Sequence, residues 1–255
     1  LNKIMAEKIN ITFPDGSVRE FDKGISAFDI AKSISNRLAD EALSVKINGE
    51  VKDLNTIINE DSKLQILTFD DPDGKDTYWH STSHLMAHAI ESLFPGAKFG
   101  VGPSIDGGFY YDIDINKNLT EEDLVKIENK MMEIAKSKNP FCRTELSKSD
   151  AIKFFENKGD NYKLEILSEL DDSNEIISIY QEGEFTDLCT GPHLPDAGKI
   201  KFVKLLSVSG SYWRGDEKKQ RMQRIYGISF PKKKMLEDHL NFLEEAKKRD
   251  HRKLG

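Results

Sequence analysis

The chain has 255 residues, of which 38% are hydrophobic and 32% charged, and its formal net charge is −7. This length suits two domains, and no apolar run reaches the length of a membrane span or forms a signal peptide, so we expect no membrane contact. Only Cys142 and Cys189 are present, which excludes a disulfide framework and favours a reducing, cytoplasmic location.

Positive charge is concentrated in one segment near the end of the chain. Residues 198–234 contain eleven Lys/Arg and two Asp/Glu, a net charge of +9, which leaves −16 for the remainder. Such asymmetry is typical of a surface that contacts a polyanion such as RNA, although a solvated basic face has the same composition.

Residues 1–70 have the pattern of a small α+β domain. Strands over 9–13 and up to Phe21 enclose a turn at Pro14-Asp15-Gly16, and Ser26 can cap a helix. Asn48-Gly49 indicates a hairpin, and a last strand follows at 64–67. This order predicts a helix packed across a mixed sheet, as in a ubiquitin-like β-grasp fold.

The acidic stretch Asp70–Asp76 contains both Pro and Gly, so we predict a domain boundary there and a second domain over 77–230. We expect a helix ending at Pro95-Gly96, a Gly-rich hairpin, a helix begun by a capping box at Thr120 and Asp123, and a shorter helix after Ser149. Strands at 176–180, 185–188, 202–208 and 222–230 complete a helix-covered sheet, and a closing helix occupies 231–255. The predicted class is α+β.

Two histidines stand out on the first helix of the second domain. His80 and His84 lie about 40° apart on a helical wheel, opposite the apolar residues that follow them. They must face water or a cleft, and the distant segment Asp187-Leu188-Cys189-Thr190-Gly191-Pro192-His193 is the natural cover for such a cleft.

The spacing His-x3-His and Cys-x3-His offers the nitrogen and sulfur donors that a tetrahedral zinc accepts. A metalloprotease motif is excluded, because Ser81 stands where the catalytic glutamate would be. Structural zinc and ordinary satisfied histidines remain open. Gly100-x-Gly102 is read as a hairpin rather than a phosphate loop, and Lys163 is by default a solvated lysine.

Six motifs, taken together, resemble one known family. They are Phe13-Pro14-Asp15-Gly16, His80-Ser81-Thr82-Ser83-His84, Gly108-Phe109-Tyr110-Tyr111-Asp112, the Asp187–His193 segment, Ser211-Tyr212-Trp213-Arg214-Gly215-Asp216 and Arg249-Asp250-His251-Arg252-Lys253-Leu254-Gly255. Their order and spacing are similar to those of the amino-terminal half of bacterial threonyl-tRNA synthetases, over nearly the whole chain. The resemblance implies a TGS-like β-grasp domain over 1–70 and an editing domain that deacylates threonine tRNA wrongly charged with serine.

The resemblance also implies roles for individual residues. The implied catalytic or pocket residues are His80, His84, Lys163, Asp187, Cys189 and His193, and the implied substrate contacts are Tyr111, Tyr110 and Arg214. We expect His80 and His84 to position water, Lys163 to stabilise charge and Asp187 to hold the substrate amine. One departure is Thr190, where the family commonly has an arginine that contacts the tRNA end.

The expected partners are the acceptor end of threonine tRNA and its seryl-adenosine moiety, while the synthetic and anticodon-binding domains would be absent from this chain. No cofactor is expected to be required, although zinc is possible on His80, His84, Cys189 and His193. The alternative function is a non-catalytic RNA-binding module with a structural zinc site.

Overall fold

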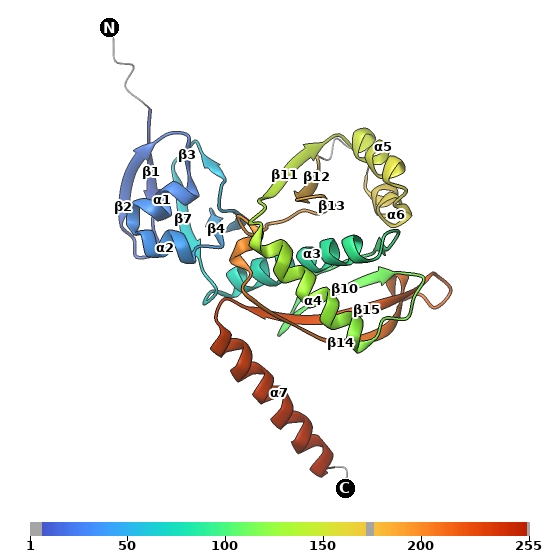
Figure 1. The fold of residues 1–255 in the computed structure, drawn as a ribbon. Helices are drawn as coiled ribbons and strands as arrows, with labels where there is room; N and C mark the ends of the chain where they lie inside the picture. The colour runs from blue at the N-terminus through green and yellow to red at the C-terminus, as the bar shows by residue number, and fades with distance from the viewer. Residues whose placement is uncertain (1–6, 172–175, 254–255) are drawn as a thin grey trace.

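A computed structural model describes residues 7–171 and 176–253 and shows two lobes with a projecting terminal helix (Figure 1). The smaller lobe is a five-stranded sheet of order β2-β1-β7-β4-β5, in which β1 and β7 run parallel and the other pairs are antiparallel. Its elements are β1 (Lys8–Thr12), β2 (Val18–Asp22), α1 (Ala27–Ile34), α2 (Asn36–Glu41), β4 (Ser44–Ile47), β5 (Glu50–Asp53) and β7 (Ser62–Leu67), with a small ribbon of β3 (Ile25–Ser26) and β6 (Ile57–Ile58). The predicted β-grasp fold is confirmed.

A helix cap, a tight turn and alternating apolar residues account for the structure of the smaller lobe. Ser26 caps α1 by accepting a hydrogen bond from the Asp29 backbone, and Asn48 and Gly49 both have positive φ in the turn between β4 and β5. The buried face of α1 and alternate strand residues such as Ile11 and Val45 form one hydrophobic core.

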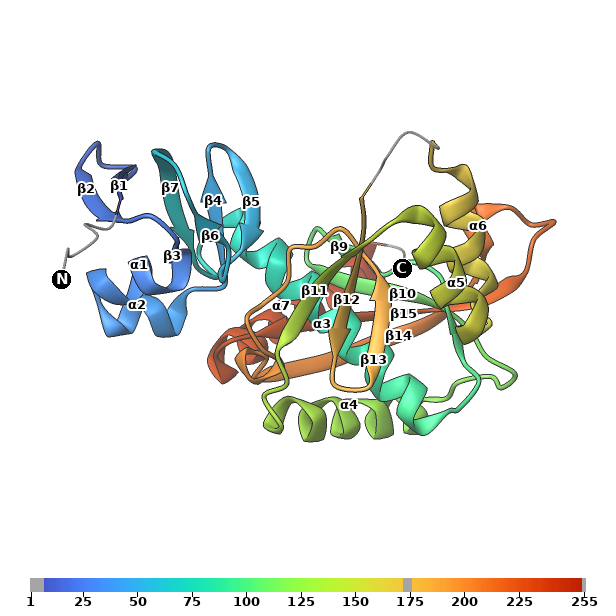
Figure 2. The ribbon, with the colours of Figure 1, turned by 90° about the horizontal axis from the view of Figure 1, so that it is seen from above.

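The two lobes meet around Phe69, which follows directly after the β-grasp sheet. Its ring lies in edge contacts with Tyr78, Trp79 and Phe230, all of the larger lobe (centroid distances 5.1, 6.1 and 5.6 Å). Seen from above, the lobes lie side by side and are joined by the start of α3 (Figure 2).

The predicted domain boundary over Asp70–Asp76 is not an irregular segment, because α3 (Pro72–Leu93) includes most of it. Pro72 occupies the first helical position, where its missing N–H costs nothing. Gly74 is there for space, since a Cβ at this position would overlap the Thr68 carbonyl. The helix therefore begins at Pro72 rather than Thr77 and packs against the β-grasp lobe from its first turn.

Helix α3 lies between two sheets of the larger lobe (Figure 1). One sheet has the order β14-β15-β10-β8, and the other has the order β11-β12-β13. The strands are β8 (Lys98–Phe99), β9 (Ser104–Ile105), which pairs with β10 (Gly108–Asp114), β11 (Phe141–Leu146), β12 (Ile177–Glu182), β13 (Phe185–Leu188), β14 (Phe202–Tyr212) and β15 (Arg221–Phe230). A single core of α3, α4 and strand side chains fills the space between them.

Three further helices cover this lobe. The capping box of Thr120 and Asp123 is confirmed at the start of α4 (Glu121–Lys136), and α5 (Lys148–Lys158) begins after its cap Ser147. Helix α6 (Asn161–Glu169) was not predicted. Short 3₁₀ turns occupy Ala197–Lys199 and Trp213–Gly215.

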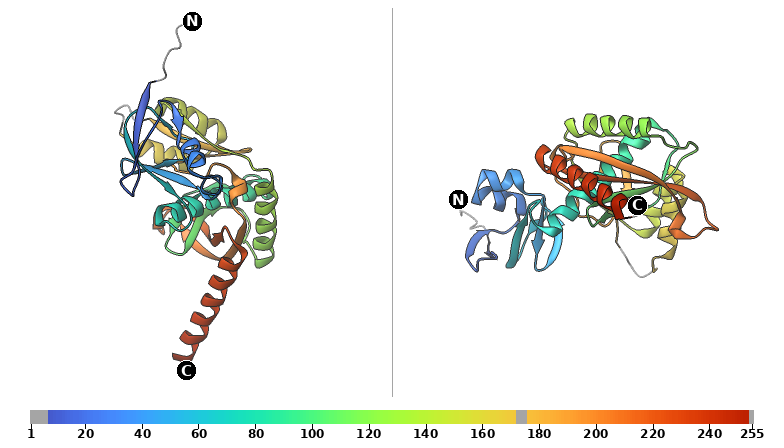
Figure 3. Two further views of the ribbon diagram at one scale, coloured as in Figure 1. Left: turned by 90° about the vertical axis from the view of Figure 1, so that its left-hand side faces the viewer. Right: turned by 90° about the horizontal axis from the view of Figure 1, so that it is seen from below.

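Helix α7 (Lys233–Lys253) leaves the body of the molecule after β15 (Figure 3). His239 contacts Phe230 near the start of the helix, whereas Phe242 is 62% exposed further along. Among the described residues, no helix combines the length and hydrophobicity that crossing a membrane requires.

Candidate functional site

The structure brings His80, His84, Cys189 and His193 into one cluster. One ligand atom from each lies within 4.8 Å of the others. His80 and His84 project from α3, while Cys189 and His193 belong to the loop that follows β13, as the sequence predicted for a covered cleft. The sulfur of Cys189 lies 3.0 Å from His80 Nε2 and 3.3 Å from His193 Nε2.

Hydrogen bonds orient the two outer histidines. His80 Nδ1 donates to the Gly102 carbonyl at 3.3 Å, so its Nε2 carries the lone pair that faces Cys189. His193 Nδ1 lies 3.0 Å from the hydroxyl of Ser81, which also accepts the Leu194 backbone N–H. The cluster is thus held by α3 itself and by the backbone of the strand-connecting segment 100–103.

Burial keeps this cluster uncharged. It lowers the pKa of His80, lowers that of His84 to about 3 and lowers that of His193, while it raises the pKa of the Cys189 thiol to about 12. At neutral pH the site therefore holds three neutral imidazoles and a thiol.

A cavity of about 410 Å³ opens beside the cluster. His80, His84, Tyr111, Lys163 and Cys189 line its polar side. Its apolar lining is Val101, Pro103, Ile166, Leu170, Ile176, Ile177 and Leu188. The volume falls in the range of sites that enclose small organic ligands.

A buried ion pair lies against the inner wall of this cavity. Lys163 is only 2% exposed, and its ammonium donates to Asp187 Oδ1 and to the Gly100 carbonyl, both at 2.7 Å. The expectation of a solvated lysine is therefore wrong, because α6 carries Lys163 inward. Asp187 also accepts from the Tyr111 hydroxyl and the Leu188 backbone, and its Oδ2 lies 3.8 Å from His84 Nε2.

Burial alone would raise the pKa of Asp187, but Lys163, His84 and the donated hydrogen bonds outweigh burial and lower it. Asp187 is thus an anion whose oxygens are occupied by protein groups, and it is not among the residues that line the cavity. This geometry favours a role for Asp187 in holding Lys163 and Tyr111 in place. It does not favour the expected role, in which Asp187 binds the amine of the substrate.

Sequence reasoning missed the contribution of Gly100 and Gly102. Their carbonyls accept from Lys163, His80 and Ser83, so the stretch dismissed as an ordinary hairpin orients two polar groups of the site. A Cβ at Gly102 would overlap the Tyr111 ring, and one at Gly100 would lie 2.9 Å from the Trp213 ring. The signal in the sequence was glycine at both positions, which allows this close approach.

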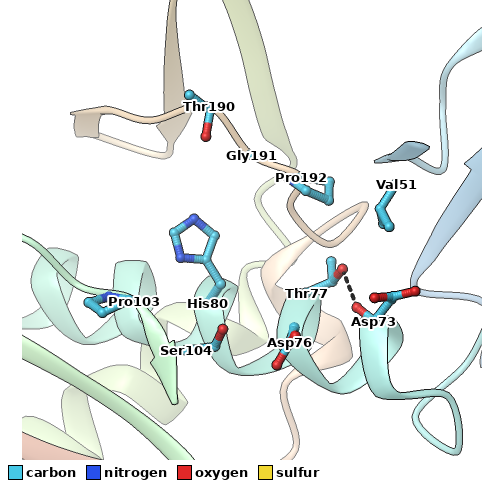
Figure 4. A pocket seen from close by; sticks show the side chains of 10 residues that line it. All are labelled: Val51, Asp73, Asp76, Thr77, His80, Pro103, Ser104, Thr190, Gly191 and Pro192. Carbon is cyan, nitrogen blue, oxygen red and sulfur yellow. Dashed lines mark hydrogen bonds between the residues drawn. The ribbon is translucent and has the colours of Figure 1, made fainter. Parts of the chain in front are cut away.

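A second hollow of about 330 Å³ adjoins the cavity and is shown in Figure 4. His80, Pro103 and Thr190 line both spaces. Val51 of the β-grasp lobe and Pro192 close one side of the hollow, and Asp73 and Asp76 line its α3 side (Figure 4). The mouth of the site is therefore shared between the two lobes.

Two expected substrate contacts lie outside the lining of the cavity. Tyr110 alternates with Tyr111 along β10, and its ring instead carries the Arg224 guanidinium at 4.0 Å. Arg214 pairs with Glu169 and Glu165 over the Trp213 ring. Thr190 lines both hollows.

The basic segment is partly neutralised. Its members Lys204, Arg214, Lys219 and Arg224 pair with Glu128, Glu169, Glu165 and Asp112. Within residues 7–171 and 176–253, five cations of the segment make no ion pair: Lys199, Lys201, Lys218, Arg221 and Lys232. Lys233 and Lys234 pair with Glu237 and Asp238 along α7.

Two domain families match the chain. The TGS domain matches residues 9–68, and the threonyl and alanyl tRNA synthetase second additional domain matches residues 177–226. The chain carries both domains. The second additional domain includes Asp187, Cys189 and His193, whereas His80, His84 and Lys163 come from the chain before the matched range.

Relatives of the chain extend this match to nearly its full length. It is 54% identical over 97% of its residues to threonine–tRNA ligase of Cytophaga hutchinsonii, and 53% identical over 97% to that of Porphyromonas gingivalis. The ligase of Caldanaerobacter subterraneus subsp. tengcongensis is 54% identical over 96%. The chain spans 38% of the length of each of these relatives. The resemblance to the amino-terminal part of bacterial threonyl-tRNA synthetases is confirmed.

Proposed function

We propose that this chain hydrolyses the ester of serine wrongly attached to threonine tRNA. The observation that carries the proposal is the cavity itself, in which neutral imidazoles and one buried ammonium face a space large enough for an aminoacyl-adenosine. Similarity to threonine–tRNA ligases and the second additional domain supports tRNA as the carrier of the ester.

The residues supply what ester hydrolysis needs. His80 and His84 hold an attacking water by hydrogen bonds, and the Lys163 ammonium stabilises the oxyanion of the tetrahedral intermediate. One of these two neutral imidazoles takes a proton from the water as it attacks. When the intermediate collapses, the ester C–O bond breaks, the imidazole returns that proton to the ribose oxygen, and serine leaves as the free amino acid. Asp187 fixes Lys163 by the 2.7 Å ion pair, and Tyr111 forms part of the wall.

Cys189 acts as a pocket residue rather than a nucleophile. Burial raises the pKa of its thiol to about 12, so almost no thiolate exists at neutral pH. Its sulfur instead accepts the Gly191 backbone N–H at 3.2 Å and contacts both outer histidines, which ties the loop to α3.

The cluster fits a zinc ion. Three neutral imidazoles and a sulfur gather within 4.8 Å, and two of the imidazoles use their second nitrogen on Gly102 and Ser81, as metal-ligating histidines do. His80, His84, Cys189 and His193 would hold the ion, which would supply a Lewis acid for the ester carbonyl. We propose that activity does not require it, because Lys163 already provides a positive charge at the cavity.

The test is to incubate the chain with seryl-tRNA(Thr) and threonyl-tRNA(Thr), with and without a chelator, and to follow loss of each ester. We expect loss of the serine ester in both conditions and little loss of the threonine ester. One methyl group gains only about 1–3 kcal/mol in a favourable pocket, so threonine must be rejected by a clash with the wall near Tyr111, His80 and Cys189.

Each outcome separates one alternative. A chain that binds the tRNA and leaves both esters intact is the RNA-binding module with structural zinc. Hydrolysis that disappears with the chelator and returns with zinc contradicts the metal-independent site. Equal rates for the two esters contradict the steric account of selectivity.

A further inference from the structure

One carboxylate of the β-grasp lobe reaches the loop that carries Cys189 and His193. Asp53 ends β5, and its Oδ1 accepts the backbone N–H of His193 at 2.8 Å. Its Oδ2 accepts the Tyr180 hydroxyl, also at 2.8 Å. A single side chain of one lobe thus holds the backbone of a cluster residue and a side chain of β12 in the other lobe.

Tyr180 packs directly against the same loop at Gly191. Its side chain is buried, and a Cβ at Gly191 would overlap its hydroxyl, so the loop crosses directly over the ring. Burial, reinforced by the neighbouring Asp53 carboxylate, raises the pKa of Tyr180, which keeps the hydroxyl protonated as the donor to Asp53.

The loop is therefore fastened from both lobes at adjacent residues. The N–H of His193 is held by Asp53, and the N–H of Leu194 is held by Ser81 of α3 at 2.9 Å. Between these anchors the His193 ring stacks on Phe141 with an interplanar angle of 7° and reaches Cys189 through Nε2. A shift of this backbone moves the Cys189 sulfur and the His193 imidazole together.

We propose that Asp53 is a positioning residue of the hydrolytic site, through which the β-grasp domain holds the Cys189–His193 loop in its working geometry. The inference rests on the proposed function, since it names a support for the same site. The β-grasp domain then affects hydrolysis in the neighbouring domain. Without the Asp53 carboxylate, the loop keeps the Ser81 hydrogen bond to Leu194 but loses the hydrogen bond to the His193 N–H.

The first test uses the two cysteines of the chain as reporters. Cys142 is exposed, whereas Cys189 is a half-buried residue of the loop itself and packs against His80, so the ratio of their alkylation rates by iodoacetamide measures displacement of the loop without any substrate. We expect Asp53→Ala to raise the rate at Cys189 about tenfold relative to Cys142, because two buried donors lose their acceptor. Asp53→Asn keeps one acceptor and should give a smaller rise.

The second test measures hydrolysis of seryl-tRNA(Thr) by the same variants. Asp53→Ala should lower kcat with little change in KM, because a displaced Cys189 no longer holds His80 in place, while the cavity lining outside the loop remains. Tyr180→Phe should act in the same direction, and the double variant should be no worse than Asp53→Ala alone, because the two groups form one link.

Ser44→Ala is the matched control. Ser44 bonds Thr77 across the same lobe interface at 3.0 Å without touching the loop, so its loss should change neither Cys189 alkylation nor kcat. Unchanged Cys189 reactivity in folded Asp53→Ala would overturn the inference, as would equal effects of Ser44→Ala. If the unaltered chain fails to hydrolyse the ester, the proposed function fails, while the alkylation ratio still decides the role of Asp53.

Discussion

At the scale of single residues, Lys163 shows how far a side chain's role depends on its surroundings. Nothing in the local sequence marks this lysine, yet the fold buries it against Asp187 and the Gly100 carbonyl. A buried ion pair adds little net stability compared with apolar groups, but breaking it leaves an uncompensated charge. Its position beside the cavity agrees with the oxyanion-stabilising role that we propose for the ammonium.

Lys163→Met should therefore reduce activity and stability by separable mechanisms. Loss of the ammonium should lower kcat for the serine ester about 10²–10³-fold, as for removal of an oxyanion donor. The unpaired Asp187 should also lower the free energy of unfolding by about 3–5 kcal/mol. Adding Asp187→Asn should restore most of the stability in urea unfolding and none of the activity. Recovery of hydrolysis in the double variant would show that the ammonium is not needed.

At the scale of elements, periodicity and caps predicted most of the architecture. The capping box of α4, the hairpin turn at Asn48-Gly49 and the β-grasp order were all readable, because each depends on neighbouring residues. Helix α6 could not be predicted from the sequence, because its apolar residues pack against two different parts of the lobe. Leu167 belongs to the core of α5, whereas Tyr162 packs on Trp213, so no single apolar stripe appears.

The hairpin of β14 and β15 carries a prediction about tRNA binding. Lys218 and Arg221 make no ion pair in the described part of the chain, whereas Arg224 is engaged by Asp112 at 2.7 Å. Because phosphate contacts release counterions, reversing Lys218 and Arg221 to Glu should lower the slope of log affinity against log salt by about 2. The slope is measured by filter binding of threonine tRNA over a salt series.

Lys32→Glu, on α1 in the other lobe, is the control for this experiment and should leave the slope unchanged (Figure 1). An unaltered slope in the hairpin variant would remove this surface from the tRNA footprint. A loss of affinity with an unchanged slope would indicate damage to the fold rather than loss of phosphate contacts.

At the scale of the whole molecule, the site is assembled from segments that the sequence keeps far apart. The motifs predicted that His80, His84, Cys189 and His193 face one another, because a helix face and a strand end have definite directions. They did not predict Asp53, Tyr180 or the glycine carbonyls, because those contacts depend on how the lobes and loops pack. Long-range hydrogen bonds leave no periodic trace in a sequence.

Burial of the cluster also predicts how stability depends on pH in chelator-treated protein. Burial lowers the pKa of His80, His84 and His193 below their ordinary 6.5. Below about pH 6.5 the unfolded chain therefore binds more protons than the folded one, and the free energy of unfolding should fall as the pH drops toward the folded pKa of about 3 for His84. Urea unfolding at several pH values measures this slope.

His84→Gln should make that decline shallower between about pH 6.5 and 5, since one fewer imidazole takes up a proton on unfolding. The variant is compared with His239→Gln on α7, whose ring is only partly covered. If the free energy of unfolding depends equally on pH in the unaltered chain and in His84→Gln, burial of the His84 imidazole does not contribute to the loss of stability at low pH.

The close approach of Gly102 to the Tyr111 ring affects how the activity of a related gene product can be judged from its sequence. A duplicated copy of this chain could keep every histidine, the cysteine and the lysine while its glycine drifts to alanine, and a census of polar residues would score that copy as intact. The added methyl would overlap the ring, displace the carbonyl that orients His80, and leave a gene product with the full signature but no activity. For the hydrolysis that we propose, glycine at position 102 is therefore a better marker of a working site than any one of the four cluster residues.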